Sequence, residues 1–517
     1  MNWHRITRTG TPAAALALLL AGCAMGPNYQ RPVVDIPPDF KEKGPWKEAA
    51  PSDTVAKGDW WKVFHDPVLD DLENHAATSN QNLRAAVARV TEARAAARIS
   101  EADFFPNITL DPTAQRVRVT NKQLLPPGSA YPSYTGNNFQ VPLDLSYEVD
   151  IWGRIRRSFE ASAEEARASI ADYETVLLTL KADVAQDYFA LRSLDAEHTL
   201  LVSTVDLRKR ALDLVRTRFE GGASSELDVA QAETELASVQ AQAADTGVRR
   251  SQLEHALAVL TGQPPARFNL PERPLDLSLP AIPAGLPSDL LERRPDVAKA
   301  ERTMAANNAR IGVAKAAFFP VVRLTGDIGF QSSDISNLFA MGSRTWGFGP
   351  SVSIPLFDAG VNSANLRRAK AQFEESTAQY RQQVLVAFAD VEDGLSGLRI
   401  LAVEAEAQDR ATKAAQRASD ISEVRYKSGL VNYLQIVDAE RTYLDNERLQ
   451  VQLNGQRFVT SVLLVKALGG GWADAPLLPA TAKPKNGKDT TPVPAVANFP
   501  ILATPAEGIP ATEPKVP

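Results

Sequence analysis

Side chains that could do chemistry are few in this chain of 517 residues. After the first residues it has four histidines, His65, His75, His198 and His255, and their spacing matches no metal-ligand pattern. The sequence contains neither a glycine-rich phosphate loop nor a G-x-S-x-G nucleophile elbow. The formal net charge of -6 gives no reason to expect a nucleic acid as partner. The sequence therefore predicts a protein that is not an enzyme and that holds no metal or cofactor.

Cys23 is the only cysteine, so the chain forms no internal disulfide. It directly follows the apolar run at 13–21, which is too short to cross a bilayer as a helix. The stretch LAGC at 20–23 resembles the bacterial lipobox. That resemblance implies that residues 1–22 are a signal peptide and that the Cys23 thiol carries a lipid anchor. An ordinary signal peptide with a stray cysteine is the alternative. Two or three acyl chains, palmitate among them, would hold the protein durably on a membrane.

The chain contains an internal duplication. The segment EADFFPNITL at 101–110 returns as KAAFFPVVRL at 315–324, which is 214 residues later. The segment RFEGGASSELDVAQAE at 218–233 aligns without gaps with RYKSGLVNYLQIVDAE at 425–440, which is 207 residues later. We therefore predict two tandem repeats. The predicted divisions are an N-terminal segment 23–61, repeat one 62–262, a linker 263–286, repeat two 287–470 and a proline-rich, disordered tail 471–517.

Each repeat is expected to contain the same elements in the same order. A first helix ends at Phe-Phe-Pro, because proline lacks the N–H group of a helical hydrogen bond. Two strands follow, and then a very long helix, a turn and a last helix. The helices are expected at about 67–103, 155–219 and 226–261, and at about 287–317, 360–427 and 433–468.

Apolar and polar residues alternate in the expected strands. The pattern is carried by Phe139, Val141, Leu143, Leu145, Tyr147 and Val149, and again by Trp346, Phe348, Pro350, Val352, Ile354 and Leu356. A period of two gives each strand one apolar and one polar face. About 11 residues also suits a tilted strand that crosses a bilayer. A soluble sandwich with one buried face is the alternative for the strands alone.

The long helices favour the membrane interpretation. At about 1.5 Å per residue each extends about 95 Å. The seven-residue series Leu177, Val184, Leu191, Val205, Leu212 and Phe219 is interrupted only by His198 and predicts a coiled-coil seam. Four membrane strands cannot close a barrel, and hydrocarbon does not tolerate open sheet edges. Strands in a membrane would therefore require an oligomer with a shared barrel, and the helices would line a shared tube.

These features resemble the outer-membrane factor family, the TolC-like and OprM-like exit ducts that include NodT-type outer-membrane lipoproteins. The motifs that carry the resemblance are the lipobox followed by GPNYQRP, the two Phe-Phe-Pro junctions, FGPSVSIPLFDAG and RYKSGLVNYLQIVDAER. The resemblance implies an α+β membrane channel. Three chains would contribute four strands each to a 12-stranded β-barrel, continuous with a periplasmic coiled-coil α-barrel. It also implies an equatorial belt that includes residues 23–61 and the linker 263–286.

The resemblance further assigns a periplasmic gate to Leu434, Asp438 and Arg441. Spacings of four and three place these residues on one helical face, so three copies would form stacked rings. A carboxylate ring can attract cations, and an apolar ring can narrow a pore. An ordinary i,i+3 surface pair of Asp438 and Arg441 is the alternative.

Four more residues match family positions near the helix tips. Asp228 and Tyr426 correspond to positions that latch neighbouring helices. Val431 stands where some members have a basic latch residue, so the gate looks more OprM-like than TolC-like. Gly222 and Gly429 would lie at the turns that the adaptor engages, and each also suits a helix C-cap.

The function that the resemblance implies is passive export of small molecules through the bacterial outer membrane. Export of this kind contributes to antibiotic resistance. Such a duct works as a homotrimer with a periplasmic adaptor, an inner-membrane transporter and outer-membrane lipid. The outer-membrane channel of a type I protein secretion system is the alternative within the family. A periplasmic coiled-coil scaffold would leave the strands without a purpose.

Overall fold

The computed structural model describes residues 24–33, 40–42, 59–120, 133–275, 277, 279–280 and 294–470. The chain divides into the units Met1–Trp472 and Ala473–Pro517, and all described residues belong to the first. Cys23, the signal peptide at 1–22 and the predicted tail at 471–517 lie outside the described residues.

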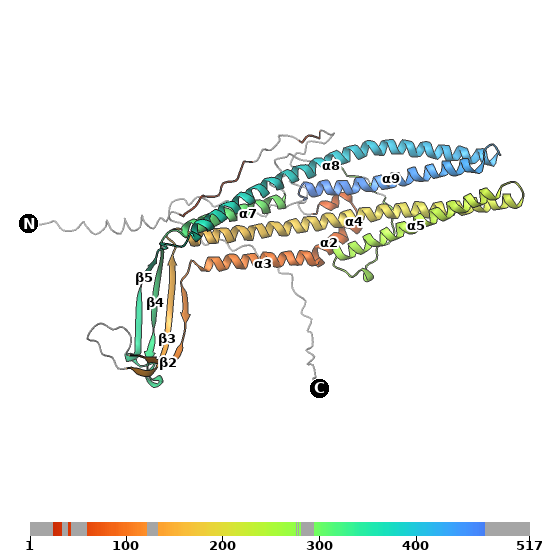
Figure 1. The fold of residues 1–517 in the computed structure, drawn as a ribbon. Helices are drawn as coiled ribbons and strands as arrows, with labels where there is room; N and C mark the ends of the chain where they lie inside the picture. The colour runs from red at the N-terminus through yellow and green to blue at the C-terminus, as the bar shows by residue number, and fades with distance from the viewer. Residues whose placement is uncertain are drawn as a thin grey trace, which may run out of the picture. The chain divides into compact units, whose positions relative to one another are not determined.

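The helices occur in matching pairs along the chain (Figure 1). Helices α3 (Gln81–Ala102) and α7 (Pro295–Ala316) have 22 residues each. Helices α4 (Arg154–Glu220) and α8 (Val361–Lys427) have 67 residues each, and α5 (Glu226–Leu260) and α9 (Tyr433–Ala467) have 35 each. The equal lengths agree with the duplication in the sequence. Among the described residues, no helix is both long and apolar enough to cross a membrane.

The prediction of one continuous helix at about 67–103 was wrong at Asn80. The segment consists of a 3-10 turn η1 (Trp60–Phe64), α2 (Pro67–Ser79) and α3. The Asn80 backbone is extended, and its side-chain oxygen accepts a hydrogen bond of 3.0 Å from the Leu83 N–H. Its amide group donates to the Leu260 carbonyl at 2.9 Å. Asn80 therefore caps α3 and joins it to the end of α5, which ends the first helix early.

The strands form one antiparallel sheet in the order β1-β3-β4-β5, and β2 also pairs with β3. The five strands are β1 (Asn107–Leu110), β2 (Thr113–Val119), β3 (Tyr134–Val149), β4 (Val321–Ser332) and β5 (Arg344–Ser353). Strands β1 and β2 follow the same edge of β3 in one register, and Pro112 lies between them. Proline has no N–H for the ladder, so the first of four expected strands is interrupted there. The sheet is thus four strands wide.

The two faces of the sheet differ in polarity, as the alternation predicted. Leu143 lies opposite Leu110 and Ile328, and Ile328 lies opposite Trp346, so these apolar residues share one face. The other face carries polar rows such as Asp144 opposite Asp327 and Glu148 opposite Arg323. Trp346 and Phe348 are 75% and 87% exposed. Most of the apolar face is therefore left uncovered by the rest of the described chain.

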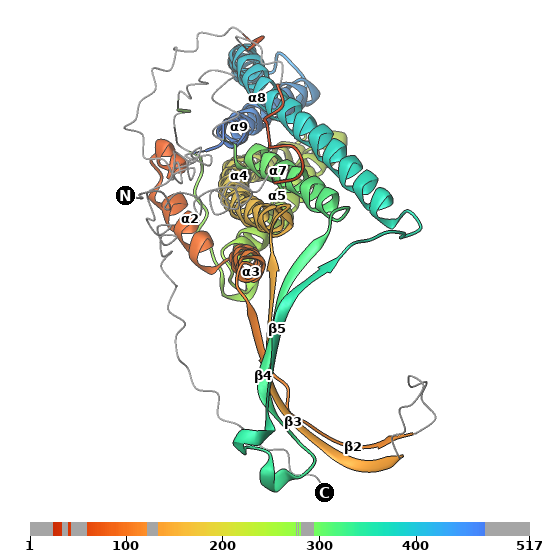
Figure 2. The same ribbon diagram turned by 90° about the vertical axis from the view of Figure 1, so that its left-hand side faces the viewer.

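The main hydrophobic core lies where η1 and α2 meet the middle of α4 and the ends of α5 and α9 (Figure 2). The Phe189 ring contacts the Phe64 and Phe458 rings at centroid distances of 4.7 and 5.0 Å. The Tyr188 hydroxyl donates to the Asp66 carboxylate at 2.6 Å, and burial and this bond raise the pKa of Tyr188 to about 12. Toward the tips the core narrows to seams, in which Leu212 packs beside Val215 and Tyr433. The coiled-coil prediction agrees with these seams up to Leu212, whereas Phe219 is 44% exposed.

Residues 24–33 form a strap that joins the two repeats. The Met25 N–H donates to the Trp152 carbonyl at 3.0 Å. Arg31 makes two hydrogen bonds of 2.8 and 2.6 Å to the Glu301 carboxylate in α7. Gly26 lies against Gly312 of α7, where a Cβ on Gly312 would be 2.6 Å from the Met25 carbonyl oxygen. The strap therefore requires glycine at 312.

We predict opposite effects for alanine at two helical glycines. Gly247 lies within α5 with open space around it, so Gly247→Ala should stabilise the fold by about 1 kcal/mol. Gly312→Ala gains the same helix propensity but displaces the strap, and we expect a net destabilisation of about 1–3 kcal/mol. Thermal unfolding of the purified proteins measures both. A rise in unfolding temperature for both variants would contradict the proposed packing of the strap.

Candidate functional site

The candidate site lies where each long helix turns back into the next (Figure 1). Gly222 and Gly429 have φ angles of +73° and +76°, which glycine adopts without strain. In each turn the residue after the glycine donates back to the helix: Ala223 to the Arg218 carbonyl and Leu430 to the Arg425 carbonyl, at 2.7 and 2.9 Å. This is the Schellman arrangement. Since a Cβ at either glycine would meet nothing within 4 Å, these positions require glycine for its backbone angle alone.

Asp228 stabilises the start of α5. Its carboxylate accepts hydrogen bonds from the Ser225 N–H at 3.0 Å and the Ser224 hydroxyl at 2.8 Å. Its own N–H donates to the Ser225 hydroxyl, which completes a capping box. Burial alone would raise the pKa of Asp228, but these hydrogen bonds outweigh it and lower the pKa below its usual range. Within one chain, Asp228 therefore caps the N-terminus of α5, the helix to which it belongs.

Tyr426 lies at the end of α8 and contacts side chains of two other elements. Its ring is 5.8 Å from the Tyr433 ring at the start of α9. The Arg218 guanidinium of α4 lies 4.6 Å from the centre of the Tyr426 ring, a cation-π contact. Tyr426 therefore connects the tip of the second repeat to that of the first.

The three predicted gate residues lie on one exposed stripe of α9. Leu434 is 46% exposed, and Asp438 and Arg441 are also exposed. The neighbouring stripe, with Tyr433 and Val437, packs against α4. The three residues of this stripe are therefore turned away from the apolar seam of α9, and all three remain exposed within one chain.

Asp438 and Arg441 do not form the simple surface pair that was the alternative. Arg441 instead donates from Nε to the Glu235 carboxylate of α5 at 2.8 Å. Glu235 is only 4% exposed, and its second oxygen lies 4.0 Å from the guanidinium of Arg208 in α4. Within the described residues, the Asp438 carboxylate takes part in no ion pair.

A second carboxylate, that of Glu440 in α9, also contacts Arg208. The Arg208 guanidinium, with 4% of its side chain exposed, also bonds the Glu440 carboxylate. Burial raises the pKa of Glu440, although Arg208 counteracts this. Two carboxylates and two guanidinium groups thus connect α4, α5 and α9 at one level. We call Arg208, Glu235, Glu440 and Arg441 the tip cluster.

A second buried ionic contact lies farther from the tip. Glu197 of α4 is 1% exposed and accepts hydrogen bonds from Arg448 at 2.7 Å and from Gln452 at 3.1 Å, both on α9. Together with the tip cluster, it shows that buried charged groups connect the two repeats in this region. Apolar seams run through the same region: Leu201 of α4 packs with Val239 of α5 and with Leu444 of α9.

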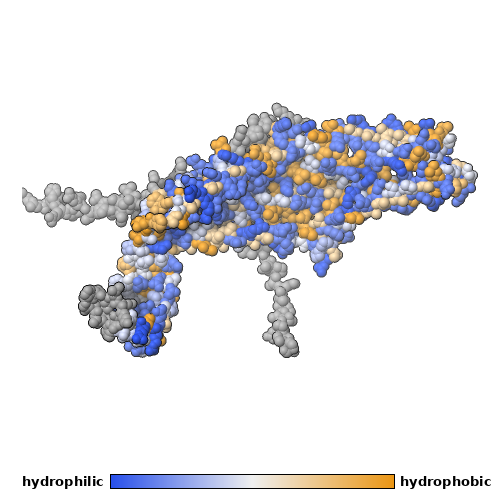
Figure 3. All heavy atoms as spheres, in the orientation of Figure 1, coloured by the Kyte–Doolittle hydropathy of each residue, from blue (hydrophilic) through white to orange (hydrophobic). Residues whose placement is uncertain are grey.

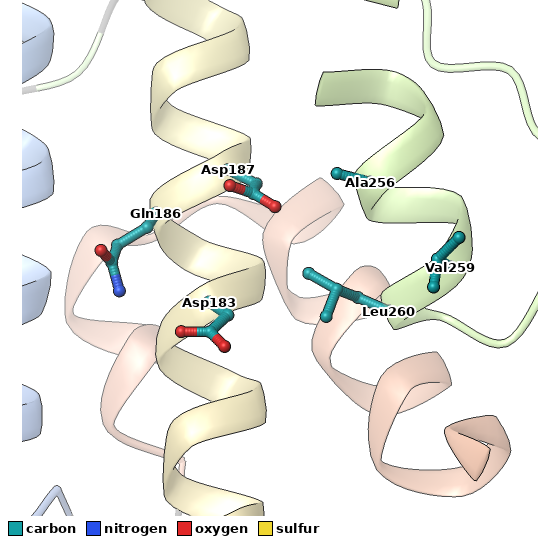
Figure 4. Close-up of a pocket in the computed structure, with 6 residues that line it drawn as sticks. All are labelled: Asp183, Gln186, Asp187, Ala256, Val259 and Leu260. Atoms are coloured by element: carbon teal, nitrogen blue, oxygen red, sulfur yellow. The ribbon is translucent and has the colours of Figure 1, made fainter. Parts of the chain in front are cut away.

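A shallow depression lies between α4 and α5 (Figure 4). Asp183, Gln186 and Asp187 line one side, and Ala256, Val259 and Leu260 line the other. Burial, together with the nearby Asp183 charge, raises the pKa of Asp187 to about 6. In Figure 4 Asp187 points toward α5, whereas Gln186 points away from it. The lining residues include no nucleophile with an adjacent base, so the depression has no catalytic arrangement.

Comparison with known proteins agrees with this architecture. The family model described as outer membrane efflux protein matches residues 72–263 and again residues 286–470. The chain belongs to the outer membrane efflux protein family. Each matched segment contains one copy of the long helix pair, which explains why the family model fits twice.

Individual relatives of this outer membrane efflux protein cover nearly its whole length. The toluene efflux pump outer membrane protein TtgC of Pseudomonas putida is 32% identical over 475 residues, 90% of this chain and 96% of the relative. The cation efflux system protein CusC of Escherichia coli is 32% identical over 471 residues, 88% of this chain and 97% of the relative. The solved outer-membrane channel OprN has a TM-score of 0.80 at 31% identity and covers 87% of this chain and 100% of OprN. The fold and the outer-membrane location expected from the sequence are thus confirmed.

Sequence reasoning missed three members of the tip cluster, Arg208, Glu235 and Glu440. A signal was present for Glu235, which lies between Ala232 and Val239 in a seven-residue apolar series. A carboxylate inside such a seam needs a buried cation, but the sequence does not say which helix supplies it.

We predict that Glu235→Gln destabilises the tip by about 3 kcal/mol, because Arg208 and Arg441 lose a buried counter-charge. Hydrogen exchange of the amides in α5 and α9 near the turns measures this as faster opening. Glu233→Gln is the matched control, since Glu233 pairs with Arg216 at the surface with about half of each side chain exposed. We expect the control to change stability by less than about 0.5 kcal/mol. Equal effects of the two variants would contradict the importance of the cluster.

Proposed function

We propose that this outer membrane efflux protein is the exit duct of a tripartite efflux system. It would passively export small molecules that an inner-membrane pump and a periplasmic adaptor deliver. The observation that carries the proposal is the combination, in one chain, of a two-faced sheet with helix pairs of 67 and 35 residues. The sheet suits passage through a membrane, and the helices suit a tube that extends about 100 Å from it.

The sheet supports a homotrimer as the working form. Strand β3 has a partner on each side, whereas β5 has only β4, and β1 and β2 have only β3. The backbone groups at the two outer edges thus lack partners among the described strands. Pairing the β5 edge of one copy with the β1 and β2 edge of the next would satisfy them. Three copies of a four-strand-wide sheet would give a closed 12-stranded barrel.

The helix tips suit contact with a periplasmic adaptor. Leu227 and Leu430, which flank the turns at Gly222 and Gly429, are 66% and 69% exposed. Exposed leucines at a tight turn present a small apolar knob that a partner helix can cover. We therefore place the adaptor contact at these two turns, in the position that the family resemblance assigns.

Relatives with efflux names support export of small molecules over protein secretion, but they differ in cargo. The printed names of two relatives mention toluene and cations. Because such different cargoes occur among relatives of similar identity, we propose no single substrate for this chain. A duct for a type I protein secretion system is the second candidate, since the same architecture would serve it.

Accumulation of a fluorescent efflux dye tests the proposed function. Cells that lack this protein should accumulate more dye than cells in which it is restored, because the pump has lost its exit. Cells with an inactive inner-membrane pump are the control, and in them deletion should add no further dye. Equal accumulation with and without the protein, in cells with an active pump, would contradict the proposal of a small-molecule duct.

Leu434, Asp438 and Arg441 form the proposed periplasmic gate. Support comes from their common exposed stripe on α9 and from the anchoring of Arg441 by the buried Glu235. In a trimer, this anchor would fix the angle of α9 and hold Leu434 and Asp438 toward the axis. Asp228 and Tyr426 would stabilise the same closed tip from within each chain.

Replacement of Asp438 by alanine should raise the leak conductance of the channel in planar bilayers several-fold, because the constriction loses the carboxylate ring that can bind cations across its axis. Asp445→Ala is the matched control: Asp445 is exposed on the same stripe but lies about 10 Å farther from the tip. An unchanged conductance for Asp438→Ala, or an equal rise for Asp445→Ala, would contradict the assignment of the constriction to Leu434, Asp438 and Arg441.

Cys23 is the proposed lipid anchor. The strap that begins one residue later is bound near Trp152, where β3 passes into α4, so the anchor would be tethered close to the membrane end of the helices. The mass of the mature N-terminal peptide tests this, and a free thiol on an unprocessed chain would contradict it.

A further inference from the structure

The apolar face of the sheet has a definite upper and lower limit. Along β3 it extends from Val149, next to α4, to Phe139, ten residues away. At about 3.4 Å per residue this is about 34 Å along the strand, or about 26 Å perpendicular to a membrane when the strand tilts by about 40°. That height matches the apolar band of barrels in an outer membrane. Figure 3 shows further apolar residues where the sheet meets the helices, and Leu356 and Phe357 there are 93% and 90% exposed.

Beyond this band, the same face becomes basic. The register places Arg116 opposite Asn137 and Arg118 opposite Thr135. Asn137 and Thr135 precede Phe139 by two and four residues, so both arginines lie on the apolar face, past its outer end. Arg344 begins β5 on the same face, opposite Phe330, which itself lies opposite Val141, so Arg344 lies just inside the outer end of the band. We call Arg116, Arg118 and Arg344 the basic rim.

The basic rim has no counter-charge within the part of the chain that the structure describes. Its three side chains are exposed and take part in no ion pair there. Arg154 and Arg323, at the other end of the sheet, both pair with Glu148. The β2–β3 connection at 121–132 contains no acidic residue in its sequence. Asp334 in the β4–β5 connection accepts from the Ser336 N–H at 3.0 Å. The three guanidinium groups are thus available to an external anion.

Apolar side chains accompany Arg344 at this end of the sheet. The Phe339 ring packs against the Phe330 ring with centroids 5.5 Å apart, and Phe330 is the residue opposite Arg344. Ile335, Phe339 and Met341 are 67%, 69% and 71% exposed. Arginine beside exposed apolar groups is the pattern of a surface that meets both acyl chains and headgroups.

We propose that the basic rim binds the phosphate groups of lipid headgroups in the outer leaflet of the membrane. A guanidinium group suits this task, because its planar fork can donate two parallel hydrogen bonds to phosphate oxygens. The inference rests on the proposed function, which directs the apolar face toward lipid. In the proposed trimer, β2 of one copy would pair with β5 of the next. Arg116 and Arg118 would then be brought toward the Arg344 of the adjacent copy, and each boundary between copies would hold one phosphate-binding cluster.

Lipid retention tests the inference on the full-length protein. The trimer is reconstituted in nanodiscs of phosphatidylcholine with a tenth of bisphosphorylated lipid A and released for native mass spectrometry, which counts bound lipid A. The triple variant R116Q/R118Q/R344Q should retain about tenfold less lipid A than the unaltered protein. The control R410Q/R417Q/R425Q removes the same charge from exposed positions in α8, far from the sheet, and should retain the normal amount. Equal retention by the two variants would overturn the proposal.

A second measurement separates failure of the rim from failure of the proposed function. Trp346 lies on the apolar face, and phosphatidylcholine brominated in its acyl chains should quench its fluorescence, with W346F giving the background. Quenching in the triple variant would show that it folds and inserts, so a loss of lipid A would then report on the arginines. Quenching in the triple variant together with an unchanged amount of retained lipid A would overturn only the proposed phosphate binding by the basic rim. Absence of quenching in the unaltered protein would overturn the membrane placement, and the rim with it.

Discussion

Unpaired backbone groups at the two edges of the sheet are the constraint on which the rest of the structure depends. A four-strand-wide sheet with one apolar face has no partner for β5 on one side or for β1 and β2 on the other. Neither hydrocarbon nor water is a good environment for the whole of such a sheet, because hydrocarbon does not accept free N–H groups and water does not favour Trp346 or Phe348. Assembly with other copies satisfies both demands, and a circle of sheets then leaves a polar interior, which is what a duct needs.

The long helices meet a different demand, since each must be held against its neighbours over 67 residues. Apolar seams hold the helices together both within and between the repeats, as where Leu201 packs with Val239 and Leu444. Buried ion pairs add to these seams between the repeats, at Glu197 and in the tip cluster. Ion pairs need definite geometry, and their loss leaves a buried charge, so they favour one arrangement of α9 against α4. In the proposed gate, this arrangement would be the closed state, which a partner protein would displace.

Duplication explains how one chain obtains two such helix pairs. The offset of 207 residues relates α4 to α8 and α5 to α9, and both turns use glycine with a positive φ angle. The repeats nevertheless differ in the surfaces that they expose. Only the second supplies the exposed stripe of Leu434, Asp438 and Arg441, and only the first has α2 and the Asn80 break among the described residues. The two repeats thus have helices of equal length but different exposed side chains. This difference suits a ring in which each repeat contacts different neighbours.

The sequence by itself determined the duplication, the order of the elements and most of their ends. Periodicity, Phe-Phe-Pro and the turn glycines are local signals, and local backbone preferences decide where a helix starts or ends. The family resemblance singled out Leu434, Asp438 and Arg441, and their spacing placed them on one face of α9. Only the tertiary structure decided that Asn80 ends the first helix and that Arg441 bonds Glu235 instead of Asp438. It also decided that Arg116, Arg118 and Arg344 share one face of the sheet. The physical reason is that the partner lies far along the chain, on another helix or strand, and only register or packing brings it near. Asn80 differs in part, because its cap on the Leu83 N–H is local and only its bond to the Leu260 carbonyl is long-range.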